Sequence, residues 1–146
     1  MKIALGSDYI GYRLKNSLKE SLDNQGLTYT DFGTFHMDIG EYPEYAYKVS
    51  NAIIKDDYDR GILIGSTGIG MCITANKLKG IRAALAYNIN TAQMSRLHND
   101  ANILCLGGNE IPEALALDIV NIWLTTSFEG GKHQKRIELI TKLTGL

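Results

Sequence analysis

Short runs rich in aliphatic residues alternate along the whole chain with stretches of helical periodicity. This alternation constrains the fold most, because strands separated by helices pair in parallel while the helices cover the faces of the sheet. The predicted strands are residues 2–5, 28–32, 61–64, 81–86 and 101–106. The predicted helices are residues 11–25, 43–55, 71–78, 91–97, 112–124 and 134–143. The pattern predicts a three-layer, doubly wound α/β fold with a five-stranded parallel sheet, similar to the Rossmann fold.

Length and charge narrow the class of protein further. The 146 residues fit one domain over residues 1–146, and 15 Lys and Arg against 16 Asp and Glu give a formal net charge of -1. That balance provides no bulk attraction to nucleic acid or to an anionic membrane, and no apolar run approaches the ~20 residues of a membrane span. The two cysteines, Cys72 and Cys105, form neither a disulfide framework nor a metal-binding CxxC pair. We therefore expect a cytoplasmic protein with reduced thiols and no nucleic-acid or membrane partner.

Three glycine-containing turns follow the predicted strands at residues 6–9, 65–70 and 107–109. Ligands of open parallel sheets bind beyond the carboxyl ends of the strands. We therefore expect these three turns to lie together and to form the binding site.

The turn Gly65-Ser66-Thr67-Gly68-Ile69-Gly70 joins a strand to the start of a helix. Glycines let the backbone approach a ligand, and the free N–H groups of a helix start favour negative charge. Such a loop could hold a phosphate, stabilise an enolate oxygen or be a tight turn without a ligand. It is neither a Walker loop, because no Gly-Lys-Ser/Thr follows, nor a dinucleotide fingerprint, because it follows the third strand and not the first.

Two further segments carry charged or titratable groups. His98 lies between a predicted helix and the fifth strand, where it could act as an acid or base near neutral pH or cap the helix. Lys132 and Arg136 are four residues apart, so on a helix they share a face and could clamp an anion or form a solvated basic helix end.

Many short motifs in order resemble the ribose-5-phosphate isomerase B family, which also contains the galactose-6-phosphate isomerase subunits. They are Gly6-Ser7-Asp8, Gly33-Thr34, Tyr42-Pro43, Asp59-Arg60-Gly61-Ile62-Leu63-Ile64, Thr67-Gly68-Ile69-Gly70, Ala75-Asn76-Lys77, Gly80-Ile81-Arg82-Ala83, Ser95-Arg96, His98-Asn99-Asp100-Ala101-Asn102 and Phe128-Glu129-Gly130-Gly131. The resemblance implies a cytoplasmic, metal-free and cofactor-free isomerase of the pentose phosphate pathway that interconverts an aldose and a ketose sugar phosphate through a cis-enediolate. It also implies a homodimer that can pair into a tetramer, with the active sites at the dimer interface.

The resemblance implies roles for individual residues as well. His98 would open the sugar ring together with Thr67. The backbone N–H groups of Gly68, Ile69 and Gly70 would hold the enediolate oxygen. The residues that would bind the sugar or its phosphate are Asp8, Tyr9, Tyr42, Asn99, Asn109, Lys132 and Arg136, the last two reaching the partner's site from the final helix.

The chain departs from the family pattern at functional positions. The cysteine base that usually follows the third strand is replaced by Gly65, and the glutamate base of a second subgroup is replaced by Met71. A usual histidine and two usual arginines are replaced by Tyr9, Asn109 and Lys132, which indicates a changed substrate. The resemblance and these departures together predict an aldose–ketose isomerase of ribose 5-phosphate and ribulose 5-phosphate or of a related sugar. The alternative is a non-catalytic or altered-substrate sugar-phosphate-binding subunit of a hetero-oligomeric isomerase.

Two residues remain as candidates for the missing base. Cys72 falls in the first turn of the predicted helix, where the helix N-terminus favours a thiolate, although its side chain could instead pack in the core. Ser66 is nearer the usual position of the base, but a hydroxyl needs an activating base of its own.

Overall fold

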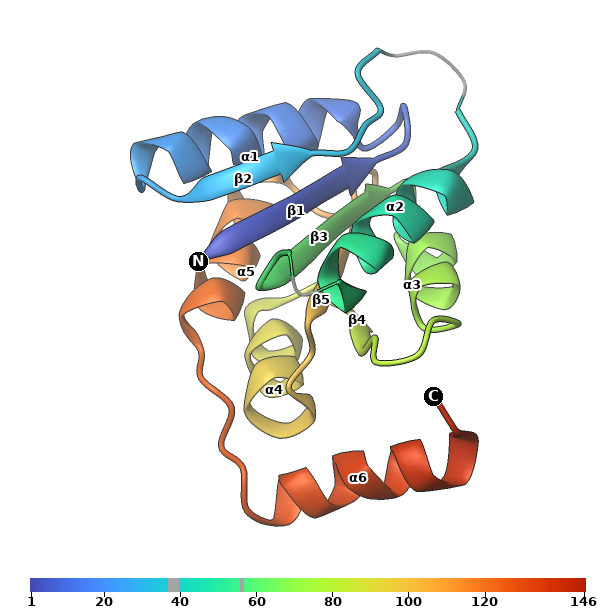
Figure 1. Ribbon diagram of the computed structural model, residues 1–146. Coiled ribbons are helices and arrows are strands. Elements are labelled where there is room, and N and C mark those ends of the chain that lie inside the picture. The colour runs from blue at the N-terminus through green and yellow to red at the C-terminus, as the bar shows by residue number, and fades with distance from the viewer. Residues whose placement is uncertain (37–39, 56) are drawn as a thin grey trace.

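The computed structural model describes residues 1–36, 40–55 and 57–146 and contains one parallel sheet between two layers of helices (Figure 1). The strands are β1 (Lys2–Ser7), β2 (Thr28–Asp31), β3 (Arg60–Gly65), β4 (Ala83–Leu85) and β5 (Ile103–Gly107), in the order β2-β1-β3-β5-β4. The helices are α1 (Tyr12–Asn24), α2 (Tyr42–Ile54), α3 (Ile69–Ala75), α4 (Ile89–Asn99), α5 (Glu113–Thr125) and α6 (Lys132–Thr144). The predicted doubly wound α/β fold is confirmed. Within the described part of the chain, no helix has the length and apolar character needed to cross a membrane.

The pleat of the strands divides their side chains between two apolar clusters. The cluster beneath α1, α4 and α5 takes Ile3, Leu5, Ile62, Ile64, Leu104 and Leu106 from the strands. The cluster beneath α2 and α3 takes Ala4, Leu63, Ile103 and Cys105. Both faces of the sheet are therefore buried, which explains why the strands appear in the sequence as nearly continuous apolar runs.

Side-chain hydrogen bonds explain where the structure departs from the predicted boundaries. α3 ends at Ala75, three residues before the predicted end, because the Asn76 side chain accepts the Ala83 N–H and donates to the Ala83 carbonyl, both at 2.9 Å. β4 begins two residues after its predicted start, and the Arg82 N–H donates to the Asn102 side chain at 2.8 Å. The loop predicted for residues 35–43 lies in part, at residues 37–39, outside the described residues.

α6 lies apart from the sheet at the foot of the molecule (Figure 1). Its buried residues are His133 and Ile137, and it packs against α4. Leu139, Ile140 and Leu143 are 51%, 52% and 76% exposed. An amphipathic helix that leaves such residues in solvent has an apolar face that this subunit does not cover.

A buried ion pair fixes the end of β2 beside α1. Lys15 of α1 is fully buried, and its Nζ lies 2.7 Å from Asp31 Oδ1 and donates a second hydrogen bond to the Thr34 carbonyl. Burial lowers the pKa of Lys15, while the Asp31 carboxylate opposes that shift. The pair holds the segment whose backbone exchanges hydrogen bonds with Ser7, one residue before Asp8.

We expect Lys15→Ala to lower the free energy of unfolding by about 3 kcal/mol, because it removes the buried partner of Asp31. Lys19 offers a matched control, since its Nζ also contacts Asp31, at 3.2 Å, but its side chain is 31% exposed. Lys19→Ala should cost less than about 1 kcal/mol. Urea denaturation of both variants tests this, and equal losses would contradict it.

Candidate active site

The carboxyl ends of β1, β3 and β5 meet at one edge of the sheet. The Asp8 N–H donates to the Ile64 carbonyl at 3.2 Å, and the Gly108 and Asn109 N–H groups donate to the Gly65 and Ser66 carbonyls at 2.8 and 3.1 Å. The three turns predicted to lie together are therefore connected by backbone hydrogen bonds.

The glycine-rich turn takes its shape from Gly68. This residue has a φ of +78°, and a Cβ on it would lie 2.8 Å from the Leu106 carbonyl oxygen, so a side chain is excluded. The Ile69 N–H already donates to Thr67 Oγ1 at 3.2 Å. The N–H groups of Gly68 and Gly70 are therefore the loop's candidate donors to a ligand oxygen.

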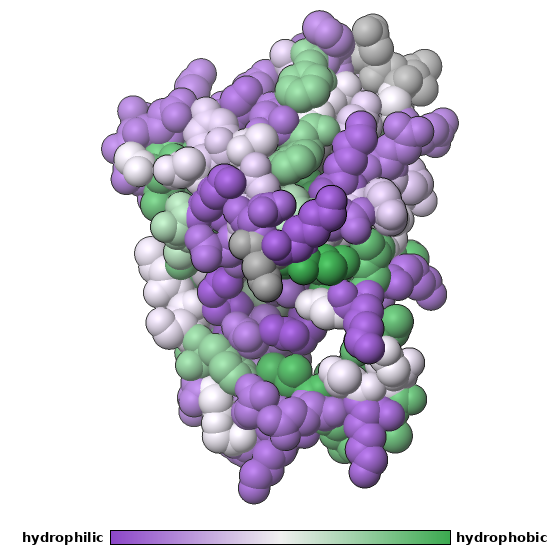
Figure 2. Space-filling model, viewed as in Figure 1, coloured by the Kyte–Doolittle hydropathy of each residue, from purple (hydrophilic) through white to green (hydrophobic). Residues whose placement is uncertain are grey.

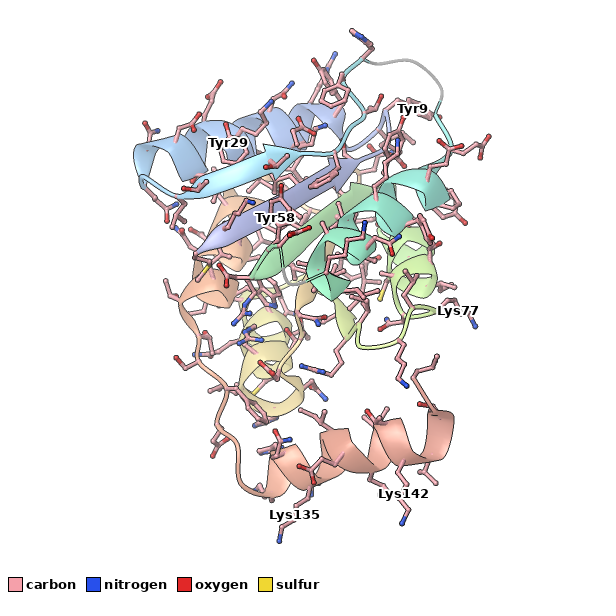
Figure 3. All side chains as sticks on the ribbon, in the orientation of Figure 1. Tyr9, Tyr29, Tyr58, Lys77, Lys135 and Lys142 are labelled. Atoms are coloured by element: carbon pink, nitrogen blue, oxygen red, sulfur yellow. The ribbon has the colours of Figure 1, made fainter. Side chains whose placement is uncertain are left out.

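Asp8, Tyr42 and Asn109, which are predicted to bind the sugar, lie beside this turn, and Tyr9 follows Asp8 at the same edge of the sheet. Asp8 is 8% exposed, and its Oδ1 accepts the Gly11 N–H at 2.9 Å. Tyr42 lies against the turn, since a Cβ on Gly70 would be 2.7 Å from the Tyr42 ring. Asn109 Nδ2 donates to Ser66 Oγ at 3.3 Å. Tyr9 is 38% exposed and projects beyond the end of β1 (Figure 3).

The Cys72 thiol lies beneath α3 and faces the sheet. Its Sγ lies 3.5 Å from the Ala83 carbonyl oxygen and 3.5 Å from Asn76 Nδ2. A hydrogen bond with Cys105 is the largest cause that lowers the pKa of Cys72 to about 7, while burial opposes it. Cys105 of β5 is level with Gly6 of β1, two strand spacings or about 10 Å away. The structure therefore does not bring Cys72 together with Asp8.

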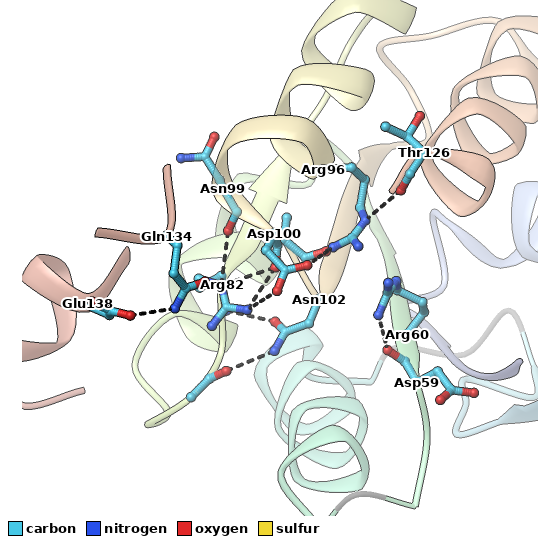
Figure 4. A network of polar contacts seen from close by, with 12 residues as sticks. Asp59, Arg60, Arg82, Arg96, Asn99, Asp100, Asn102, Thr126, Gln134 and Glu138 are labelled. Atoms are coloured by element: carbon cyan, nitrogen blue, oxygen red, sulfur yellow. Dashed lines mark hydrogen bonds and ion pairs between the residues drawn. The ribbon is translucent and has the colours of Figure 1, made fainter. Parts of the chain in front are cut away.

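The second set of predicted residues lies at the opposite end of the sheet. His98 and Asn99 end α4, where Arg82 Nε donates to the Asn99 carbonyl at 3.0 Å and the Arg82 guanidinium pairs with Asp100 at 2.9 Å (Figure 4). Arg82 precedes β4, so these residues lie at the amino ends of the strands. The six residues of β3 separate them from Thr67 by about 20 Å.

The start of α6 joins this second set. The Glu129 N–H donates to the Leu97 carbonyl at 3.1 Å, and the His133 ring stacks on His98 with centroids 4.2 Å apart. Glu129 Oε2 lies 3.8 Å from His98 Nε2 and 3.6 Å from His133 Nε2. His133 was not singled out from the sequence; Glu129 precedes α6, and the turn at Gly130 and Gly131 that brings the two side chains together leaves no helical spacing to indicate the pair.

This His98–Glu129–His133 cluster is poorly arranged for a metal ion. Its candidate ligand atoms all lie within 4.8 Å of one another, but the two rings are within 10° of parallel. Imidazole binds a metal in the plane of its ring, so one ion could not lie in both planes without rotation of a ring. The arrangement instead lets one carboxylate face two imidazoles.

Comparisons with known proteins agree with these features. The family described as Ribose/Galactose Isomerase matches residues 3–140. The chain is 42% identical over 142 residues to ribose-5-phosphate isomerase B of Escherichia coli strain K12, covering 97% of this chain and 95% of the relative. It is 46% identical to the solved ribose-5-phosphate isomerase B of Clostridium thermocellum, with a TM-score of 0.98 over 99% of this chain and 98% of that chain. The Mycoplasma genitalium ribose-5-phosphate isomerase B structure with bound ribulose-5-phosphate is 37% identical, with a TM-score of 0.93 over 99% and 96%.

The surroundings of His133 predict a pH-dependent stability. The pKa of His133 is lowered mainly by burial and, to a smaller extent, by the charge of His98. As the pH falls, His133 is therefore protonated in the unfolded chain before it is protonated in the folded protein. The free energy of unfolding is highest above about pH 6.5 and decreases as the pH falls toward the pKa of His133 in the folded protein. We expect His133→Asn to reduce the loss of Tm between pH 7.5 and 5.5, whereas His36→Asn, at an exposed position, should leave it unchanged. Equal losses in the wild type and His133→Asn would contradict this expectation.

Proposed function

The chain belongs to the Ribose/Galactose Isomerase family and is a sugar-phosphate isomerase; we propose that it interconverts ribose 5-phosphate and ribulose 5-phosphate. The observation that carries this proposal is the glycine-rich turn beside Asp8, at the edge where open parallel sheets bind ligands. This substrate pair places the enzyme in the pentose phosphate pathway, and its free thiols fit the cytoplasm.

The turn suits the charge that develops during the reaction. Moving a proton from C2 to C1 of the open-chain sugar passes through an enediolate, whose oxygen carries negative charge. Backbone N–H groups that are already oriented stabilise such an oxygen without reorganisation. In this proposal the N–H groups of Gly68 and Gly70 perform that role, and Asp8 and Tyr42 border the sugar.

Ring opening and phosphate binding require the residues at the other end of the sheet. Substrate in solution is mostly cyclic, and His98 can move the ring-opening protons near neutral pH. Lys132 and Arg136 at the start of α6 supply positive charge for the phosphate. Lys132 attracts a phosphate as a point charge, without the bidentate fork of an arginine.

One subunit cannot bring these groups together, because about 20 Å separates them along β3. We therefore propose a homodimer in which His98, Asn99 and α6 of one subunit complete the Thr67 turn of the partner, and which can pair into a tetramer. Apolar side chains that remain exposed on the single subunit support this arrangement, and some of them are visible as green patches in Figure 2. A cavity of about 380 Å³ separates α6 from the body, and the exposed residues near the two groups include Ile69, Ile73, Ile89, Leu139, Ile140 and Leu143.

A substrate panel tests the proposed reaction. Purified protein is incubated with ribose 5-phosphate, hexose 6-phosphates and the unphosphorylated sugars, and the aldose and ketose forms are quantified by NMR. We expect ribose 5-phosphate to give a higher kcat/KM than unphosphorylated ribose, because the cations at Lys132 and Arg136 need a phosphate partner. Turnover of a hexose 6-phosphate alone would change the substrate, and the absence of turnover on every sugar would favour a non-catalytic subunit.

Mixed dimers test whether one site needs two subunits. Subunits carrying Thr67→Ala and subunits carrying His98→Ala are co-expressed with different tags, and the heterodimer is purified through both tags. Each mutant homodimer should be slow, while the heterodimer should recover about half of the wild-type activity, since a two-fold dimer then has one intact site. A heterodimer no faster than its parent homodimers, or a fully active monomer in light scattering, would contradict shared sites.

A further inference from the structure

The proposed reaction needs a base that removes the proton from C2, and the position beside the turn is Gly65, which has no side chain. The groups that could replace a side chain there must reach the space next to the N–H groups of the turn. The strand register identifies one such group.

Asp8 is the neighbour of Gly65 across the sheet. β1 and β3 pair Gly6 with Leu63 and Ser7 with Ile64, so the next positions along the two strands are Asp8 and Gly65. The hydrogen bond from the Asp8 N–H to the Ile64 carbonyl, at 3.2 Å, continues this pairing past the end of β1. Paired residues project to the same face of a sheet, so the Asp8 side chain lies on the side where a residue-65 side chain would project.

The local distances describe the space beside Gly65. A Cβ on Gly65 would lie 3.3 Å from Asp8 Oδ2, 3.3 Å from Met71 Cγ and 3.8 Å from the Gly68 nitrogen. The Asp8 carboxylate and the first N–H group of the turn therefore border the same small space.

The carboxylate is held in this position. Its Oδ1 accepts the Gly11 N–H at 2.9 Å, and the residue is 8% exposed. The bond to Gly11 fixes the orientation of the carboxylate and leaves Oδ2 as the oxygen directed toward Gly65. The other candidate bases are less well placed, because Cys72 faces the sheet beneath α3 and Ser66 Oγ accepts a hydrogen bond from Asn109.

We propose that Asp8 is the catalytic base, acting through Oδ2 in the space that Gly65 leaves open. Asp8 Oδ2 takes the proton from C2, the C2–H electron pair forms the C1–C2 double bond, and the carbonyl pair moves to O1 beside the turn. In the second half, Asp8 returns the proton to C1, O2 becomes the carbonyl oxygen, and the O2 proton passes to O1. A carboxylate performs the equivalent proton transfer in triosephosphate isomerase. This assignment rests on the proposed function.

Asp8→Asn tests the assignment, because asparagine keeps the acceptor for the Gly11 N–H and removes the base. We expect kcat on ribose 5-phosphate to fall by about 10³-fold with a small change in KM, and uptake of solvent deuterium at the sugar carbon to be lost. Asp118→Asn, at an exposed position of α5, should match the wild type. If Asp8 only binds a sugar hydroxyl, KM rises and the deuterium uptake at saturating substrate persists.

A second variant separates loss of the base from damage to the site. Gly65→Cys in the Asp8→Asn background places a thiol beside the turn, and its Cβ requires the residue-8 side chain and Met71 to shift by only a few tenths of an ångström. We expect it to restore kcat by at least about tenfold and to make the activity sensitive to iodoacetamide, whereas the wild type has no thiol in this space and should keep its activity in this reagent even where Cys72 is alkylated. Absence of rescue with the same Tm as the wild type would overturn the assignment.

Two further outcomes decide between the proposals. If the wild type shows no isomerase activity on any sugar phosphate, the proposed function fails. If the wild type is active but Asp8→Asn keeps its deuterium uptake, only the role of Asp8 fails. Loss of deuterium uptake in Cys72→Ala or Ser66→Ala, or inactivation of the wild type by iodoacetamide with protection by substrate, would also overturn the assignment. Wild-type resistance to iodoacetamide supports the role of Asp8 even where Asp8→Asn does not fold.

Discussion

The parallel register of β1, β3 and β5 is the constraint on which the site depends. Because Ser7, Ile64 and Leu106 are aligned across the sheet, the turns that follow these strands begin at the same level and share backbone hydrogen bonds. A shift of one residue in either pairing would turn side chains to the opposite face. The carboxylate of Asp8 and the N–H groups of the glycine-rich turn would then no longer border one space. The backbone hydrogen bonds between the strands thus determine where the candidate catalytic groups lie.

Most of the fold and one half of the candidate site could be predicted from the sequence, for a simple physical reason. Ile62 and Leu104 are buried on one face of the sheet and Leu63 and Cys105 on the other, so the strands appear as apolar runs between glycine-containing turns. The carboxyl ends of parallel strands necessarily share one edge. Knowledge of the strand ends therefore sufficed to group Asp8 with Thr67.

The rest depends on features that a linear sequence does not display. The stack of His133 on His98 requires the path of Gly130 and Gly131, which have φ angles of +71° and +57° and bring the start of α6 back to the end of α4. The direction of the Cys72 thiol follows from how α3 packs on β4 and β5, and no local pattern encodes that rotation. The alternation of strands and helices already places His98 and Thr67 at opposite ends of the sheet, since α4 runs back along the sheet. The family resemblance nevertheless assigns both residues to one active site.

The isolated position of α6 has a consequence for how the molecule behaves on dilution. The helix is joined to its own subunit through His133, Ile137 and the contact with α4, so little of its stability comes from the sheet. Its amides should therefore exchange with solvent independently of the core, at a rate that depends on protein concentration, since the proposed partner covers its apolar face. Association would then complete the secondary structure of the last helix at the same time as the site, and dissociated subunits would retain a folded sheet with a loosened C-terminal arm.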